Sequence, residues 1–508
     1  MVLKKKILLF SLLSFSILNF VFSLETEFWQ QTLQTAFSNS ITINRIINEY
    51  SSTLIQKKQY DYSWFPVIQA GLQESLNIQR GDNLYVLNQT PDSSFKMLMS
   101  PAASLSVIQK LPGRGQLSFT ADYAFSWLTE QNAFIQFPQL QLKLNQSLTR
   151  GAFGITKDTE LLLIREQLSY SRLIMEKNLF EELKSIINLL SSADILLAQK
   201  DYYKALAEEY KSQASTAKNK EKSGLQSGLQ SFYAEHQTVE AENKLNELSF
   251  KEKDLLKNLY LILPDFDIKQ INDKRIELAD LIQEISGKLT NYFHEEAEKL
   301  IEQNLDSQIY SNSLRQYNLQ KKNEDKNSAP VLYFSSTLKT DNNFYNSYSD
   351  WFKSFRSLNQ SPYPIDFSVA VGIQKTFELS SAKKLRNDIY RLYSDSITKE
   401  MQIKQVSQKG QLFILLAQIE ADTKYIKELK AQLESENTFR IERAELLSKG
   451  LITQDEFYKG ESLYFLIYSD YIQSFWKTVD NYLELIKICN GIDTFMIRLL
   501  GDNYEKLF

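Results

Sequence analysis

Three stretches of the chain alternate apolar and polar residues, the pattern of a β-strand with one apolar face. From Ile365 to Ile373 every second residue is Ile, Phe or Val. The same alternation runs from Leu117 to Trp127 and from Leu140 to Asn145. Since successive side chains of a strand point to opposite faces, each stretch predicts a strand with one apolar and one polar face. A soluble β-sandwich gives the same pattern, but strands of about 9–11 residues also suit a tilted crossing of a bilayer.

Two other stretches have apolar residues at the 3–4 spacing that is typical of helices. They run from Lys157 to Ser223 and from Ser381 to Lys449, and neither contains proline. At 1.5 Å per residue, a helix of about 67 residues extends about 100 Å, which predicts a coiled coil and not a compact domain.

Each long helix is predicted to end at a glycine, after which a second helix returns. Gly224 and Gly450 follow the two stretches, and glycine accepts the left-handed conformation that ends many helices. The return helices are predicted from Gln226 to Ile262 and from Thr453 to Cys489.

The same order of elements occurs twice. In each half a helical stretch stops at a proline, Pro66 or Pro330, and a strand follows. Proline lacks the backbone N–H and disfavours helix in the residue before it, so Phe65 and Ala329 mark the predicted helix-to-strand junctions. The chain therefore contains two repeats of helix, strands and helical hairpin.

The first 23 residues predict an export signal. Lys4, Lys5 and Lys6 precede an apolar stretch of about 16 residues, shorter than the ~20 that span a bilayer. Val21 and Ser23 then suit cleavage before Leu24. The alternative is a membrane anchor helix. Export favours a membrane β-barrel over a soluble sandwich for the alternating strands.

Composition excludes several other classes of protein. The net charge is −4, so a basic face for nucleic acid is not expected. One Cys and two His leave no disulfide and make a His- or Cys-based metal site improbable. No nucleotide-binding, serine-hydrolase or zinc-protease motif is present. Composition alone leaves an enzyme built on carboxylates possible, but 62 Asp and Glu residues give no way to choose two. We predict no catalytic residue, no cofactor, no metal and no enzymatic activity.

Taken together, these features resemble the TolC-type outer membrane efflux proteins, also called outer membrane factors. The resemblance rests on the signal peptide, the helix–proline–strand junctions, the long helices, and a tip reading Gly-Leu-x-Ser/Thr before the return helix. Gly450 and Thr453 carry the clearer copy of the tip, in GLITQDEFYKG, and Gly224 and Ser227 carry the other. The motifs cover nearly the whole mature chain.

The resemblance implies an α+β membrane protein. Three subunits would each give four strands to one 12-stranded transmembrane β-barrel, continued by a periplasmic α-helical coiled-coil barrel. Between Pro101 and Trp127, however, the chain carries two extra strand-like runs. Which runs of the first half form the membrane wall is left open by the sequence.

The resemblance also places pore and gate candidates at the helix tips. Asp455, Glu456 and Lys459 follow Gly450 where relatives line the entrance with acidic rings. An equally good reading makes Asp455 and Glu456 ordinary first-turn carboxylates that complement the helix dipole. Relatives' locking arginine aligns with Ile452, and the acidic position of the first copy aligns with Gln230, so that lock is not expected here.

The sequence predicts eight segments in order. They are a signal peptide (1–23), a helical segment (24–65), strands with an extra hairpin (66–148), a coiled-coil hairpin (149–265), an equatorial helical segment (266–329), strands of the second repeat (330–378), its coiled-coil hairpin (379–491) and a C-terminal tail (492–508).

Two functions remain open at this stage. The first is a passive exit channel of a tripartite efflux pump or type I secretion system, with a homotrimer in outer membrane lipid, a periplasmic adaptor protein and an inner membrane transporter. The second is a periplasmic or surface coiled-coil structural or adaptor protein with a soluble β-domain. Adaptors usually have one helical hairpin, whereas two are predicted here.

Overall fold

The computed structural model describes residues 27–80, 95–111, 115–128, 133–148, 159–225, 228–264, 266–268, 270–271, 274–275, 278, 282, 299–328, 331–340, 365–375, 380–501 and 504. The predicted signal peptide (1–23), Ser227 and Pro330 lie outside these ranges. Over the part of the chain that is described, no helix is both long and apolar enough to span a bilayer.

The chain divides into two units, each of which is assembled from several stretches of sequence. Unit 1 comprises residues 1–51, 170–312 and 396–508, and unit 2 comprises 52–169 and 313–395. The division falls inside the helices α3 (Ile41–Tyr62), α4 (Thr159–Lys222), α7 (Leu305–Ser328) and α9 (Ser380–Ser448).

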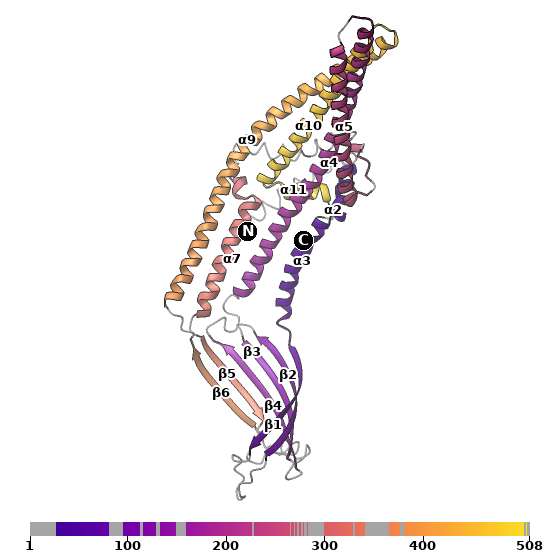
Figure 1. Cartoon of the computed structure of the whole chain (residues 1–508). Coiled ribbons are helices and arrows are strands. Elements are labelled where there is room, and N and C mark those ends of the chain that lie inside the picture. The colour runs from indigo at the N-terminus through magenta and orange to yellow at the C-terminus, as the bar shows by residue number, and fades with distance from the viewer. Residues whose placement is uncertain are drawn as a thin grey trace. The chain divides into compact units, whose positions relative to one another are not determined.

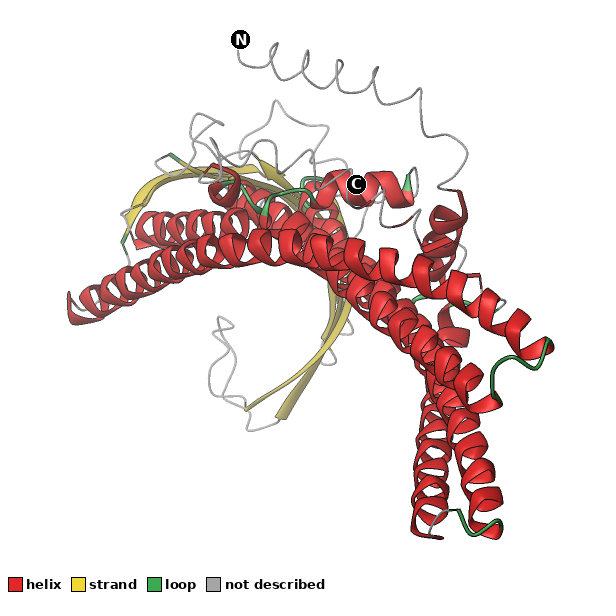
Figure 2. Cartoon of the chain, turned by 90° about the horizontal axis from the view of Figure 1, so that it is seen from above, coloured by secondary structure: helices red, strands yellow, loops and turns green. Residues whose placement is uncertain are grey.

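Unit 2 contains one antiparallel sheet of six strands that pair in chain order (Figure 1). The strands are β1 (Val67–Arg80), β2 (Phe95–Leu111), β3 (Gly115–Leu128), β4 (Ala133–Ser147), β5 (Val331–Thr340) and β6 (Ile365–Gln374). Seen from above, the sheet is an arc (Figure 2). The first repeat supplies four strands and the second supplies two. The extra hairpin, β2 and β3, lies inside the sheet, so the described part of the chain has six strands in one sheet where the resemblance implied four per subunit.

The first helix-to-strand junction lies at the predicted proline. Helix α3 ends at Tyr62, and the N–H of Phe65 donates to the Tyr62 carbonyl oxygen at 2.9 Å in a closing turn. Pro66 then separates this turn from β1. The helix therefore ends three residues before the expected position, because a short turn lies between helix and proline.

Unit 1 contains the two helical hairpins, α4 with α5 (Gly228–Ile262) and α9 with α10 (Gln454–Ile488). The two outgoing helices have 64 and 69 residues, or about 96 and 104 Å at 1.5 Å per residue. Both end within two residues of the predicted positions. Two shorter helices, α2 (Glu27–Asn39) and α11 (Ile492–Leu500), complete the unit.

Helices α4 and α10 contact each other through a regular series of polar pairs. Lys184 Nζ lies 2.9 Å from Asp480 and 2.5 Å from Glu484. Further toward the tips, Glu209 accepts a hydrogen bond from Ser462. As the partners move along α4 in the direction of the chain, they move back along α10. The two hairpins are thus tied together along an antiparallel pair of helices.

The helical unit has an apolar core near the end of α10. It is formed by side chains from the start of the 299–328 segment, from α9 and from α10: Ile301, Leu412, Leu415, Ile419, Leu485, Ile488 and Cys489. Each exposes less than a tenth of its surface, and burying such side chains is the main stabilising contribution in a domain core.

Candidate functional site

The six-stranded sheet has one apolar and one polar face, and both faces continue across all the strands. Cross-strand partners share a face, so the register gives each face directly. One row runs Ile68↔Val107, Val107↔Phe119, Phe119↔Leu142, Leu142↔Leu338 and Leu338↔Phe367. The adjacent row on the other face runs Gln69↔Ser106, Ser106↔Thr120, Thr120↔Gln141, Gln141↔Lys339 and Lys339↔Asp366. Every residue of the first row is apolar and every residue of the second is polar.

The apolar face is uncovered within the chain. Leu72 exposes 91% of its surface, Phe367 67% and Ile373 75%. A contiguous apolar surface of this extent marks a site for another apolar phase or partner. The opposite face carries its own polar contacts, such as the hydrogen bond from Ser335 Oγ to Asn145 Oδ1 at 2.8 Å. Each face has exceptions in the register. On the polar face they include Val67, Ile108, Leu98, Ile135 and Phe137, and on the apolar face Glu74, Gln109 and Gln136.

The two helical hairpins turn by the same local structure. Gly224 has φ 71° and Gly450 has φ 68°, both in the left-handed region that favours glycine. In each tip the glycine N–H donates to the third carbonyl back and the following leucine N–H to the fifth back, at 2.9 Å in every case. This pair of bonds is the Schellman motif, which satisfies the last carbonyls of a helix. Both glycines therefore end their helices as predicted.

Thr453 and Glu456 form a capping box at the start of α10. The Glu456 N–H donates to Thr453 Oγ1 at 3.2 Å, and the Thr453 N–H donates to Glu456 Oε2 at 2.9 Å. Two N–H groups that the helix itself cannot satisfy thus find partners. The hydrogen bonds from the Thr453 backbone and side chain lower the pKa of Glu456. The Glu456 carboxylate is exposed, and it caps the first turn of α10.

The other two charged candidates lie apart from this box. Asp455 accepts a hydrogen bond from Ser212 of α4, so it joins the two hairpins near their tips. Lys459 is exposed one turn later, and its carbonyl oxygen accepts from Ser462 Oγ at 3.1 Å.

Gly460, the small residue of the predicted tip motif, has a packing role. A Cβ at this position would lie 2.0 Å from Nη1 and 2.7 Å from Cδ of Arg443 on α9. The absence of a side chain therefore lets the arginine cross α10.

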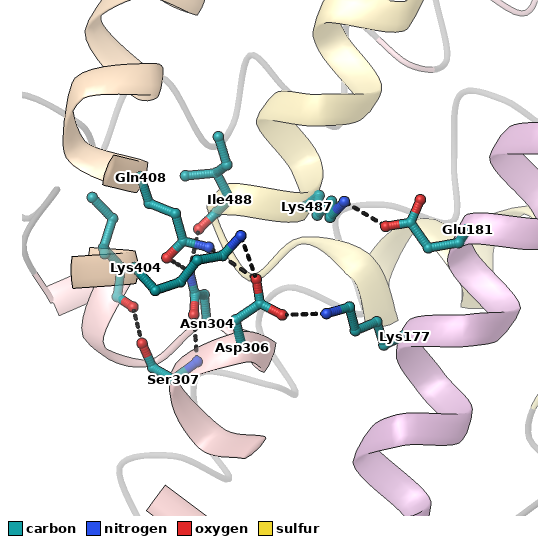
Figure 3. Close-up of polar contacts among 10 residues, drawn as sticks. Lys177, Glu181, Asn304, Asp306, Ser307, Lys404, Gln408, Lys487 and Ile488 are labelled. Atoms are coloured by element: carbon teal, nitrogen blue, oxygen red, sulfur yellow. Dashed lines mark hydrogen bonds and ion pairs between the residues drawn. The ribbon is translucent and has the colours of Figure 1, made fainter. Parts of the chain in front are cut away.

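A polar cluster around Asp306 joins four helices and was not predicted from the sequence. Asp306 lies in the first turn of α7. Its carboxylate accepts hydrogen bonds from Lys177 Nζ of α4 at 2.8 Å and from Gln408 Nε2 of α9 at 3.1 Å, and Lys404 Nζ lies 3.6 Å away (Figure 3). Burial opposes the charged carboxylate, but the hydrogen bond from Lys177 and the charges of Lys177, Lys404 and Lys487 lower the pKa of Asp306 overall.

Asn304 extends this cluster to α10. Its amide Nδ2 donates to Gln408 Oε1 at 2.8 Å and to the Ile488 carbonyl oxygen at 3.4 Å, and its Oδ1 caps α7 by accepting from the Ser307 N–H at 2.9 Å (Figure 3). On the α10 side, Lys487 pairs with Glu181 of α4. The cluster thus links α4, α7, α9 and α10 through charged and amide side chains.

A second buried pair lies farther along the same helices. Arg275 Nε and Nη2 donate to the two oxygens of Asp194 at 2.6 and 2.9 Å, and Trp476 Nε1 donates to Asp194 at 2.7 Å. Burial disfavours the charged guanidinium, but the hydrogen bond and charge of Asp194 outweigh burial and raise the pKa of Arg275. The partners are 81 and 282 residues from Asp194 in sequence, so no local pattern indicates them.

Among the described residues, no group of three or more His, Cys, Asp and Glu side chains is arranged to hold a metal ion. Cys489 is buried in the apolar core, and His236 is exposed on α5.

Comparison with known proteins places the fold. No protein-family model matches the sequence, and no curated protein does. The structure is similar to that of the CmeC outer membrane channel of Campylobacter jejuni, with a TM-score of 0.59 and 10% identity over 94% of this chain and 90% of that one. It is also similar to CusC, with a TM-score of 0.56 and 10% identity over 91% of both chains. The CusC crystal structures address the conformational changes that accompany folding and transmembrane channel formation. The open-state MtrE outer membrane channel of Neisseria gonorrhoeae gives a TM-score of 0.53 and 10% identity over 91% of this chain and 88% of that one. The resemblance drawn from the sequence motifs is thus confirmed in three dimensions: the chain has the fold of the TolC-type outer membrane channels.

Proposed function

We propose that the protein is a passive outer membrane exit channel of an efflux pump or type I secretion system. The observation that carries the proposal is the sheet with one uncovered apolar face and one polar face across all its strands. An apolar face of this kind suits lipid, and a polar face suits a water-filled lumen. The fold shared with outer membrane channels supports the same assignment.

The sheet has two free edges, β1 and β6, and an open edge cannot persist in lipid. We propose that identical subunits close it, as a homotrimer, by pairing β1 of one subunit with β6 of the next. The helical hairpins would extend into the periplasm. There an adaptor protein linked to an inner membrane transporter would dock on the tips and open them.

Transport in such a channel needs no covalent chemistry and no cofactor, because the energy comes from the inner membrane partner. The chain itself has to insert into the outer membrane, form the conducting pore and open when the adaptor protein binds. The tips carry exposed apolar residues, among them Leu225 at 79% and Leu451 at 68% exposure, which suit a protein partner.

The deciding experiment combines fractionation with conductance. The purified protein should migrate as a heat-modifiable trimer from the outer membrane fraction and should form discrete conductance steps in planar bilayers. Recovery in the soluble periplasmic fraction, without conductance, would support the soluble coiled-coil alternative.

A further inference from the structure

The inference concerns the hairpin β2–β3, which is an addition to the four strands per subunit that the family resemblance implies. It rests on the proposed trimeric channel. We infer that strands β2 (Phe95–Leu111) and β3 (Gly115–Leu128) form part of the membrane wall, so that each subunit contributes six strands and the trimer closes an 18-stranded ring with a wide lumen.

The first support is the unbroken pairing of the sheet. β1 pairs with β2 along its whole length, from Val67↔Ile108 to Arg80↔Phe95. β3 pairs with β4 from Gln116↔Asn145 to Leu128↔Ala133. If the hairpin stood outside the wall, both pairings would be lost and β1 would have to pair with β4 instead. Because buried backbone groups in lipid must be paired, this exchange would remove two ladders and form one.

The second support is the chemistry of the two faces. The apolar face of the hairpin carries Ala103, Leu105 and Val107 on β2, and Leu117, Phe119, Ala121 and Tyr123 on β3. Its polar face carries Ser104, Ser106, Ser118, Thr120 and Asp122. The register aligns these faces with those of β1 and β4. A hairpin outside the membrane has no reason to continue both faces without a shift.

The third support is length. β2 has 17 residues and β3 has 14, more than the about 9–11 that a tilted strand needs to cross the hydrocarbon core. The hairpin is therefore long enough to belong to the wall rather than to a loop above it.

The consequence for the lumen follows from barrel geometry. With a strand spacing of about 4.8 Å and a tilt of about 40°, 18 strands give a backbone diameter of about 36 Å, and 12 strands give about 24 Å. After about 5–6 Å of side chain on each side, the open width is about 25 Å against about 13 Å. The β-barrel end of this channel would therefore admit cargo about twice as wide as a 12-stranded ring would admit.

Single cysteines on the two faces test the inference. Phe119→Cys and Thr120→Cys lie on opposite faces of β3, and Phe367→Cys and Ser368→Cys form the reference pair on β6. Native Cys489 is buried, and burial raises the pKa of its thiol, so it gives little background reaction. Trimers in liposomes would be labelled with a water-soluble maleimide, and bimane-labelled protein would be quenched with brominated lipid.

We expect Thr120→Cys and Ser368→Cys to react at least about tenfold faster than their apolar-face neighbours, and only the neighbours to be quenched by lipid. If β6 alternates while both β3 positions react fast and escape quenching, the hairpin lies outside the wall. The inference then fails and the proposed channel stands. If neither strand alternates, the proposed channel fails and the inference falls with it.

Should a β3 variant not assemble, Val107→Cys and Ser106→Cys on β2 serve as the same pair. End-on electron microscopy of the unmodified trimer gives an independent answer. A ring of 18 strand cross-sections supports the inference and one of 12 overturns it.

Discussion

At the scale of single residues, Glu456 combines two features that the sequence alone does not separate. Its position three residues after Thr453 fits a capping box, and its charge fits a pore entrance. The structure supplies the capping contacts and leaves the lumen-facing role as a proposal.

Glu456→Gln separates the two features, because glutamine at this position can still form the box. The side chain would keep its contact with Thr453 and lose only its charge. If the carboxylate faces the lumen, cation selectivity and block by divalent cations should both fall in single-channel recordings. Thr453→Ala is the matched control, since it breaks the box and leaves the charge. Unchanged selectivity in Glu456→Gln would assign the residue to capping alone.

Asp306 predicts a pH-dependent contribution to the stability of the helical unit. Its pKa is lowered in the folded chain, so its contribution is present above the ordinary carboxyl pKa near ~3.9 and is lost as the pH falls through the lower folded value. Asp306→Asn should cost about 1–3 kcal/mol at pH 7, because Lys177 and Lys404 lose their charged partner.

Denaturant unfolding followed by circular dichroism at pH 7 and at about pH 3 would measure this difference, which should shrink at the lower pH. The exposed carboxylate Glu434 on α9, the helix that carries Lys404 and Gln408, provides the control Glu434→Gln, with little expected effect. A pH-independent loss in Asp306→Asn would instead indicate a packing defect.

The residue clusters also mark where sequence analysis stops. Asp306, Lys177 and Gln408 lie more than 100 residues apart pairwise, and their residue types are common on solvated helices. Only the packing of four helices brings them together. Tip residues were easier to identify because a helix end depends on its immediate neighbours.

At the scale of elements, the glycine tips offer a sharp test. Gly450→Pro places proline at φ 68°, which its ring cannot adopt, and removes the N–H that donates to Leu447. We expect the hairpin to lose its reversal and the protein to lose adaptor binding, while a membrane-inserted trimer still forms. Co-purification with the adaptor and heat-modifiable mobility would show both.

Gly410 provides the matched control in the middle of α9. A Cβ there meets no atom within 4 Å, so Gly410→Ala should stabilise the helix by about 0.5–1 kcal/mol and leave adaptor binding unchanged. Loss of binding in both variants would mean that α9 as a whole, and not its tip, carries the docking.

If the sheet forms the membrane wall, substitutions at neighbouring positions on β6 should have unequal effects on the yield of folded trimer. Val369 lies on the apolar face and is 51% exposed, and Ser368 lies on the polar face. Val369→Arg should cost about 2–4 kcal/mol near the bilayer centre and reduce the yield of folded trimer. Ser368→Arg should be tolerated and should change conductance. Equal losses at both positions would indicate a soluble sheet.

The elements show why some features could be predicted and others could not. The limits of α4 and α9 lie within two residues of the predicted limits, since a proline-free run stopped by glycine is a local signal. The break between α2 and α3 at Ser40 was missed, because Ser40 is buried and its hydroxyl bonds Glu182 of α4. The two extra strand-like runs were identified from the sequence, but their place in the sheet was left open. Alternation identifies a strand but not its neighbours, and only the pairing places β2 and β3 in the sheet.

At the scale of the whole molecule, wall and tips belong to different units, Val369 to unit 2 and Gly450 to unit 1. Changes at distant sites without shared partners usually add within about 0.3–0.5 kcal/mol. The double variant Val369→Arg with Gly450→Pro should therefore show the trimer yield of the first change and the adaptor binding of the second. Quantitative blotting of outer membranes and pull-down of the surviving trimer would measure the two. A yield far below that of Val369→Arg alone would reveal coupling between the units.

The pairing of β4 with β5 also implies an order of folding events. It runs from Gln141↔Lys339 to Ser147↔Tyr333. Strands β1 to β4 follow one another closely and can form hairpins early, whereas about 180 residues of helix and connection separate β4 from β5. Closing so long a loop is slow compared with forming local hairpins. If the chain is exported as proposed, the completed edge of β4 stays unpaired until the second repeat follows. An unpaired strand edge is a template for aggregation. We therefore expect the edge of β4 to be the surface of the nascent chain that most needs a periplasmic chaperone.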